Sequence, residues 1–293
     1  MLLYDFIRCF QQNTPRCAYT SQLGYKALAV NLSDIAAMGG TPRDAFVSLG
    51  IPRTFSVEFL EEFYHGLKAL AGKYEVNILG GDTTHSKSDL FISVTLTGTI
   101  KKAHICYRNG AQVGDAICVT GTLGDSAAGL EILMAQRERS PDFAECLVKA
   151  HLEPTPHIAQ GQFLAESGVV TAMLDVSDGL SSDIRHICRQ SNVGARLYES
   201  RLPLSESLQY YAAKYTKNPI AFALSGGEEY CLLLTVQNGS VHGLAQQYQA
   251  QFHVPLFGIG EIVSGAEIGF VKSDGEKIPL PAMGYDHFTS RDP

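Results

Sequence analysis

The 293-residue sequence has no run of lysine and arginine that could form a basic stripe. Its basic residues occur singly or in short groups such as Lys101-Lys102, and its formal net charge is -7. Electrostatic binding to nucleic acids depends on clustered basic residues. The sequence therefore predicts that no nucleic acid is a partner.

Long apolar runs are also missing. No segment reaches the roughly 18 uncharged apolar residues that a membrane-spanning helix needs. The first ten residues are apolar but include Asp5 and Arg8, and no small-residue cleavage site follows them. We expect neither a membrane partner nor a signal peptide.

Paired cysteines are absent as well. The seven cysteines are scattered, odd in number and never spaced as Cys-x-x-Cys. Neither a zinc site nor a disulfide framework is indicated. This pattern favours a reducing, cytoplasmic location.

Several familiar catalytic and nucleotide-binding motifs are not found. The glycine-rich loop at residues 121–125 lacks both the Walker lysine and the G-x-G-x-x-G spacing. No G-x-S-x-G elbow is present, and no histidine stands out as a general acid or base. These absences leave acidic residues as the main candidates for chemistry.

The sequence does contain an acidic turn between two apolar elements. Residues 169–174 read as a buried strand that leads into Asp175, Ser177, Asp178 and Gly179, and a helical pattern follows. Two carboxylates three residues apart repel unless a cation lies between them, and hard cations such as Mg2+ take oxygen ligands. The helix N-terminus offers further N–H groups to a phosphate. The alternative is a helix-capping aspartate beside a solvated one.

A second acidic residue lies in an apolar helix expected over residues 24–38. Because this helix is apolar on nearly every face, we expect it, and Asp34 with it, to be buried. A buried carboxylate is costly unless it is paired or bound to a metal. The alternative is a local hydrogen bond in which the Asp34 carboxylate accepts from a backbone group.

Two Gly-Gly-acid segments lie beside expected strands. Gly80, Gly81 and Asp82 follow a strand at residues 76–79, and we expect the glycines to mark its end and to let the backbone approach a ligand. Taken alone, this segment also fits a plain turn. The second segment, residues 226–228, precedes a strand at residues 231–236 and ends in Glu228.

The acidic positions indicate a function more clearly when they are considered together. If the fold gathers Asp34, Asp82, Asp175 and Asp178, they would form a phosphate site with several Mg2+ ions. Such a site favours phosphoryl transfer by positioning and charge neutralisation. Arg108 could clamp a phosphate with its guanidinium group, although an exposed surface arginine is the alternative.

Six collinear motifs are spread from about residue 22 to residue 288. They are residues 24–39, Gly80-Gly81-Asp82-Thr83, Arg108-Asn109-Gly110-Ala111, residues 174–180, residues 225–230, and Gly284-Tyr285-Asp286-His287-Phe288. In order and spacing these motifs resemble those of the thiamine-monophosphate kinase family, which is related to aminoimidazole ribonucleotide synthetase.

The resemblance implies a two-domain α/β (α+β) fold. Residues 1–103 would form an N-terminal mixed sheet that binds ATP and metal and closes a barrel with its twin in a homodimer. Residues 104–293 would form a C-terminal α+β sandwich. The implied reaction is ATP-dependent phosphorylation of thiamine monophosphate to thiamine diphosphate, by direct in-line transfer with several Mg2+ ions.

The same resemblance implies roles for individual residues. Asp178 and Asp34 would be catalytic, and Glu228 and Tyr285 would contact thiamine monophosphate. Two further groups are implied: the metal ligands Asp34, Asp82, Asp175 and Asp178, and the ATP contacts Gly81, Asp82, Arg108 and Ser177.

The sequence departs from the family at several positions. The family usually has a G-D-D-A segment and a D-x-L-x-E-G-x-H-F strand before the helix at Gly24, and residues 1–21 match neither. Glu229 and Cys231 stand where the family more often has Asp and Glu. One alternative is therefore a catalytically impaired relative that binds nucleotide or thiamine phosphate, with slow turnover expected. A metal-dependent phosphatase is a third reading.

Overall fold

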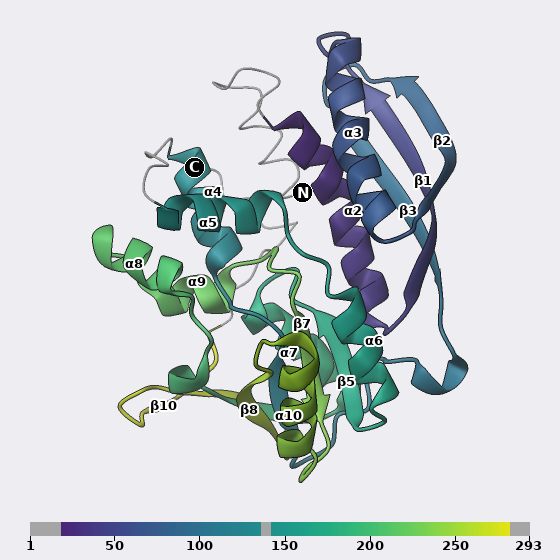
Figure 1. The fold of residues 1–293 in the computed structure, drawn as a ribbon. Helices are drawn as coiled ribbons and strands as arrows, with labels where there is room; N and C mark the ends of the chain where they lie inside the picture. Colours follow the sequence, from purple (N-terminus) through teal and green to yellow (C-terminus); the bar gives the residue numbers. More distant parts are fainter. Residues whose placement is uncertain (1–18, 136–141, 282–293) are drawn as a thin grey trace.

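The computed structural model describes residues 19–135 and 142–281, and these form two β-sheets with helices packed around them (Figure 1). The small sheet has three strands in the order β2-β1-β3. Its strands are β1 (Thr41–Ile51), β2 (Asn77–His85) and β3 (Phe91–Thr99). β1 pairs parallel to β2 and antiparallel to β3, so this is the mixed sheet that the family resemblance implies.

The large sheet has seven strands in the order β10-β9-β6-β8-β4-β7-β5. The strands are β4 (Ala116–Val119), β5 (Val170–Asp175), β6 (Gly194–Tyr198), β7 (Leu232–Val236), β8 (Phe257–Val263), β9 (Ile268–Val271) and β10 (Lys277–Pro279). β9 and β10 form a hairpin whose turn lies at residues 273–276, closed by a hydrogen bond from the Lys272 N–H to the Glu276 carbonyl. The other pairings are antiparallel except for β6 with β9, which run parallel.

Some helices in the described ranges pack against these sheets and others pack against one another. The helices of these ranges are α2 (Thr20–Ala37), α3 (Val57–Lys73), α4 (Asp125–Met134), α5 (Asp142–Leu152), α6 (Ile158–Glu166), α7 (Leu180–Ser191), α8 (Glu206–Lys214), α9 (Pro219–Ser225) and α10 (Val241–Phe252), with short 3-10 turns η1 (Lys102–His104) and η2 (Glu199–Arg201). The side chain of Ser56 accepts a hydrogen bond from the Phe59 N–H and caps α3, as its position before the apolar pattern predicts.

Helix α2 lies between the small sheet and the rest of the molecule (Figure 1). Two glycines explain how closely α2 and α3 approach each other. A Cβ atom at Gly24 would lie 1.8 Å from the Phe63 carbonyl oxygen, and one at Gly66 would lie 1.8 Å from the Ser21 carbonyl oxygen. The expected end of α2 at Gly39 is also confirmed, since this residue has φ +77° just after the helix.

The hydrophobic core follows the alternation of the large sheet. Met173 and Leu234 pack into the core that also includes α2 and α3, whereas Leu174 and Leu233 pack into a second core on the other face, under α7. The C-terminal half is therefore a layered α+β arrangement, and the core of its inner face continues across α2 to the small sheet. The domain boundary at residue 103 remains a prediction.

Strand β2 corrects one expectation. The Gly80-Gly81-Asp82 segment does not end a strand, because β2 continues to His85 along β1. The register shifts between Ala45 and Phe46, and both glycines adopt positive φ beside this irregularity, at +148° and +153°. A Cβ atom at Gly81 would lie 1.7 Å from the Val47 carbonyl oxygen, so the pairing requires glycine there.

Candidate active site

The expected strand-to-helix turn after Asp175 is confirmed. β5 ends at Asp175, α7 begins at Leu180, and Gly179 between them has φ +106°. Asp175 is buried, and its Oδ2 accepts a hydrogen bond of 2.6 Å from the Ser33 hydroxyl on α2. The loop at residues 176–179, called here the acidic loop, is therefore fixed to α2 at its first end.

Asp34 and Arg108 lie in the electrostatic environment of Asp175. Burial raises the pKa of Asp175 to about 6; the negative charge of Asp34 adds to this rise, while the Ser33 hydrogen bond and the Arg108 guanidinium oppose it. Partial loss of solvent at the edge of the core also raises the pKa of Asp34, although its side chain is exposed, and Arg108 again opposes the rise. The fold thus gathers these three predicted residues from α2, β5 and the segment before β4.

The burial expected for Asp34 is wrong. Its neighbour Ser33 is the residue that faces the core, and Asp34 is exposed at the edge of that contact. Helical geometry explains the difference, because adjacent positions point about 100° apart around the axis. Ser33 is held in the core by its bond to Asp175, so the exposed Asp34 carboxylate beside it can still reach a ligand.

Asp178 belongs to a group that the sequence analysis missed in part. Ligand atoms of Asp178, Asp183 and His186 all lie within 4.8 Å of one another. Asp183 is buried, its Oδ2 accepts a hydrogen bond of 3.2 Å from the Asp178 N–H, and burial together with Asp178 and Asp175 raises its pKa to about 8. The available signal was the i, i+3 spacing of Asp183 and His186 on the first turns of α7.

The segment Gly226 to Tyr230 clamps the acidic loop from the other side. The Glu228 N–H donates to the Ser177 carbonyl at 2.8 Å, and the Tyr230 N–H donates to the Val176 carbonyl at 2.9 Å. Both residues have positive φ, +65° and +53°, which is unusual for residues other than glycine. Strained backbone of this kind persists where surrounding contacts hold it, and it is often found at functional sites.

The Glu228 side chain lies in a buried ion pair. Its Oε2 is 2.9 Å from Lys26 Nζ and 3.3 Å from His151 Nδ1. Lys26 and His151 are both fully buried, on α2 and α5. The substrate contact expected for Glu228 remains a prediction, and the structure adds a lysine partner that the sequence analysis did not identify.

The glycine-rich loop before α4 is occupied by a protein carboxylate. Glu229 Oε1 accepts hydrogen bonds from the N–H groups of Gly124 at 2.9 Å and Ser126 at 3.1 Å. Burial raises the pKa of Glu229 well above its usual range. The N–H groups that could have cradled a phosphate at this helix start already donate to a carboxyl oxygen of the protein.

Two other predicted site residues lie apart from this group. Gly81 and Asp82 are exposed on β2, where Asp82 pairs with Ser48 of β1, and no interaction within the described ranges links Asp82 to Asp34, Asp175 or Asp178. Ser177 is half-buried in the acidic loop. Tyr285 lies outside the described residues.

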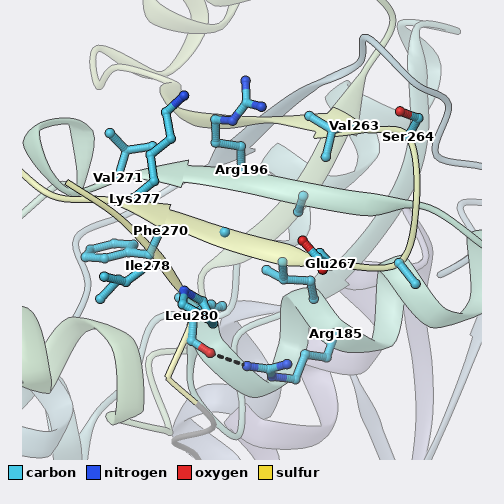
Figure 2. Close-up of a pocket in the computed structure, with 15 residues that line it drawn as sticks. Arg185, Arg196, Val263, Ser264, Glu267, Phe270, Val271, Lys277, Ile278 and Leu280 are labelled. Carbon is cyan, nitrogen blue, oxygen red and sulfur yellow. Dashed lines mark hydrogen bonds between the residues drawn. The ribbon is translucent and has the colours of Figure 1, made fainter. Parts of the chain in front are cut away.

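A cavity of about 670 Å³ lies elsewhere, along β9 and β10. Figure 2 shows Arg185 of α7 at one end of it, where its Nη2 donates to the Leu280 carbonyl at 2.7 Å. None of the predicted site residues lines this cavity. The candidate active site is therefore not this cavity. It is the acidic group, defined here as Asp34, Asp175 and Asp178 with Arg108, Asp183 and His186 beside them.

The described part of the chain contains no helix that is both long and apolar enough to cross a membrane. Two family models match the sequence: the N-terminal domain of AIR synthase related proteins over residues 12–100, and their C-terminal domain over residues 112–272.

The chain also matches individual known proteins and a solved structure. The chain is 39% identical to a thiamine-monophosphate kinase of Escherichia coli K12 over 272 residues, 92% of this chain and 81% of the relative. It is 36% identical to that of Bacillus subtilis over 269 residues, 91% and 81% of the two chains. A solved structure of AaThiL complexed with AMPPCP and TMP matches with a TM-score of 0.82 at 36% identity, covering 93% of this chain and 82% of that one.

Proposed function

Because the chain belongs to the thiamine-monophosphate kinase family, within the AIR synthase related proteins, we propose that it transfers the γ-phosphoryl group of ATP to thiamine monophosphate. The products are thiamine diphosphate and ADP. The observation that carries the proposal is the gathering of Asp34, Asp175 and Arg108 beside a clamped acidic loop, in a chain 36% identical to a kinase solved with AMPPCP, an ATP analogue, and TMP.

The acidic group fits Mg2+ by its chemistry. Carboxylate oxygens are the ligands that this cation prefers. The negative charge of Asp34 disfavours ionisation of Asp175, and a divalent cation would relieve that repulsion. We propose that Asp34, Asp175 and Asp178 hold Mg2+, joined by Asp82 and by the Asp183–His186 pair.

The remaining roles concern the nucleotide and the substrate. Arg108 would place a guanidinium against a phosphate oxygen, and Ser177 would contact ATP from the acidic loop. Gly81 and Asp82 would contact ATP from β2. Glu228 and Tyr285 would contact thiamine monophosphate.

The proposed transfer depends on positioning and charge. Bound Mg2+ would neutralise phosphate charge as the γ-phosphoryl group moves in line to the substrate phosphate. Asp34 and Asp178 would fix the reacting groups, and the clamp of Gly226 to Tyr230 on the acidic loop would keep Asp178 in place between turnovers. Preorganised charges of this kind supply most of the rate enhancement in many enzymes.

We also propose that the chain works as a homodimer. The outer face of the small sheet exposes Phe46 and Phe91, 42% and 61% accessible, and Leu79 on β2 is 59% accessible. Exposed apolar residues gathered on one sheet are typical of an interface. A second copy packed on this face would close the barrel, and light scattering of the intact chain would measure the assembly.

A cytoplasmic location accompanies this proposal. The five cysteines within the described ranges are all free thiols, and free thiols are the usual state in the cytoplasm. Cell fractionation would test the location.

The experiment that tests the function measures ADP release with ATP and Mg2+, with and without thiamine monophosphate. A kinase releases ADP only when thiamine monophosphate is present, and phosphorus NMR would then show thiamine diphosphate. Release of free phosphate would identify a phosphatase, and binding without release would identify an inactive relative. Either outcome would overturn the proposal.

Asp178→Asn provides the matched variant for this assay. We expect kcat to fall about 100- to 1,000-fold, by analogy with the loss of one preorganised charge-stabilising group. The thermal unfolding midpoint should change little, because the half-buried Asp178 side chain fills no core. Asp274→Asn, in the β9–β10 turn, serves as the control and should leave kcat unchanged. Equal activity of the wild type and Asp178→Asn would remove Asp178 from the site.

A further inference from the structure

Lys26 is the most enclosed charged residue in the described part of α2. It is 0% exposed, whereas Asp34, the other charged residue of this helix, is exposed. Burial lowers its pKa, and the carboxylate of Glu228 opposes this shift. A buried lysine needs an explanation, because removing a charge from water is costly.

Lys26 and His151 both lie against one oxygen of Glu228. Lys26 Nζ donates to Glu228 Oε2 at 2.9 Å and lies 3.4 Å from His151 Nε2. His151 Nδ1 lies 3.3 Å from the same Oε2 and 3.0 Å from the Ser126 hydroxyl. Two side chains from two helices therefore converge on Oε2.

The protonation of His151 follows from this geometry. Burial and the charge of Lys26 lower the pKa of His151 well below its usual range, so the ring is neutral. An ammonium on Lys26 has only N–H donors, so opposite it His151 Nε2 would accept and Nδ1 would carry the proton. Nδ1–H can then donate toward Glu228 Oε2 or the Ser126 hydroxyl.

The other carboxylate oxygen of Glu228 is left out of this network. Oε1 takes part in no hydrogen bond or ion pair with any residue that the structure describes. The backbone of Glu228 is also fixed, through its N–H bond to the Ser177 carbonyl. Glu228 thus has a fixed backbone and one fixed carboxylate oxygen, and its other oxygen can accept a hydrogen bond from a further donor.

Stability alone does not account for this arrangement. Replacing a buried ion pair with apolar residues of similar volume is often neutral or stabilising. A chain that needed only a packed contact between α2 and Glu228 would do as well with apolar side chains. Keeping the charges makes sense if the carboxylate must stay ionised and oriented.

Given the proposed function, on which this inference rests, we propose that Lys26 is a positioning residue for substrate recognition. With His151 it holds Oε2 of Glu228, so that Oε1 accepts a hydrogen bond from the amino group or faces the thiazolium cation of thiamine monophosphate. Ser33, two helical turns along the same face of α2, holds Asp175 in the same way. One helix face thus orients a substrate carboxylate and a metal carboxylate.

The test is steady-state kinetics of Lys26→Met with each substrate varied in turn. We expect the KM for thiamine monophosphate to rise about 10- to 100-fold, the range for losing a charged hydrogen bond. The KM for ATP and kcat should stay within about threefold. Lys26→Gln keeps one donor and should give an intermediate KM. Lys149→Met, an exposed lysine on α5, is the control and should change neither KM.

The kinetic results for Lys26→Met distinguish a positioning role of Lys26 from a purely structural one. A purely structural role would move both KM values and kcat together, or neither, and either result would overturn the proposal. If Lys26→Met does not fold, as judged by circular dichroism, Glu228→Gln takes its place and must raise the KM for thiamine monophosphate alone. A wild type without thiamine-monophosphate-dependent ADP release would instead refute the proposed function, and this inference with it.

Discussion

The two Gly-Gly-acid segments of this chain have the same sequence pattern and opposite environments. Gly80, Gly81 and Asp82 lie on β2 and are exposed. In residues 226–228 the acid is buried: Glu228 is 4% exposed and is paired with a lysine from another element.

The backbone differs between the two segments as well. On β2 the glycines themselves have positive φ, at a register shift in a parallel pair. In the second segment Glu228 has positive φ, and a Cβ atom on Gly227 would lie 2.5 Å from the Ser177 carbonyl oxygen. In both cases glycine allows one backbone to approach another closely. The Gly-Gly-acid pattern therefore indicates that two backbone segments approach closely. Whether its acid is buried or exposed depends on residues that are distant in the sequence.

The largest stability effect that would test this comparison is expected for Gly81→Ala. A Cβ atom there meets the Val47 carbonyl oxygen at 1.7 Å, and φ is +153°. We expect the free energy of unfolding to fall by about 2 to 3 kcal/mol, the range for imposed backbone strain. Chemical denaturation monitored by circular dichroism would measure it.

The control for Gly81→Ala is Gly72→Ala on α3. Gly72 has no atom within 4 Å of a built Cβ and has no positive φ. This change should stabilise the protein by about 0.5 to 1 kcal/mol, because alanine favours helix and restricts the unfolded chain. If Gly81→Ala were as well tolerated as Gly72→Ala, close approach would not be the reason for glycine on β2.

A smaller stability effect is expected for Phe46→Glu on the outer face of the small sheet. Phe46 is 42% exposed, so the charge should change the free energy of unfolding of a single chain by at most about 0.5 kcal/mol. The same charge would be buried in the proposed dimer, where it is costly. Light scattering should therefore give the mass of one chain for the variant and of two chains for the wild type. A variant that remains dimeric would place the interface elsewhere.

Much of the fold could be predicted from local patterns. The apolar helix before Gly39, the Ser56 cap, the turn after Asp175 and the hairpin at residues 273–276 all depend on residues close in sequence. Glycine, capping residues and hydrophobic period determine such features directly. The exception was β2, which continues through two glycines because β1 offers it a parallel partner.

The site was predictable only in part, and the reason is distance along the chain. The family motifs implied metal-binding roles for Asp34 and Asp175 and an ATP contact for Arg108, and the charges of Asp34 and Arg108 both act on Asp175 in the structure. The pairing of Lys26 with Glu228 joins residues that are 202 positions apart, so no local sequence pattern could predict it. The helix pattern also predicted that Asp34 is buried, because it did not resolve which of Ser33 and Asp34 faces β5.

The central claim is that the acid of residues 226–228 is fixed by Lys26 of α2, and a double-mutant cycle tests it most directly. Lys26→Met, Glu228→Gln and the double variant would be compared with the wild type by chemical denaturation. We predict a coupling energy of about 2 to 3 kcal/mol, because each single change leaves a buried group without its partner. The reference is Arg196–Glu261, a pair at 2.8 Å with side chains 40% and 41% exposed, whose coupling should stay below about 1 kcal/mol. Additive effects of Lys26→Met and Glu228→Gln, within about 0.5 kcal/mol, would contradict the claim.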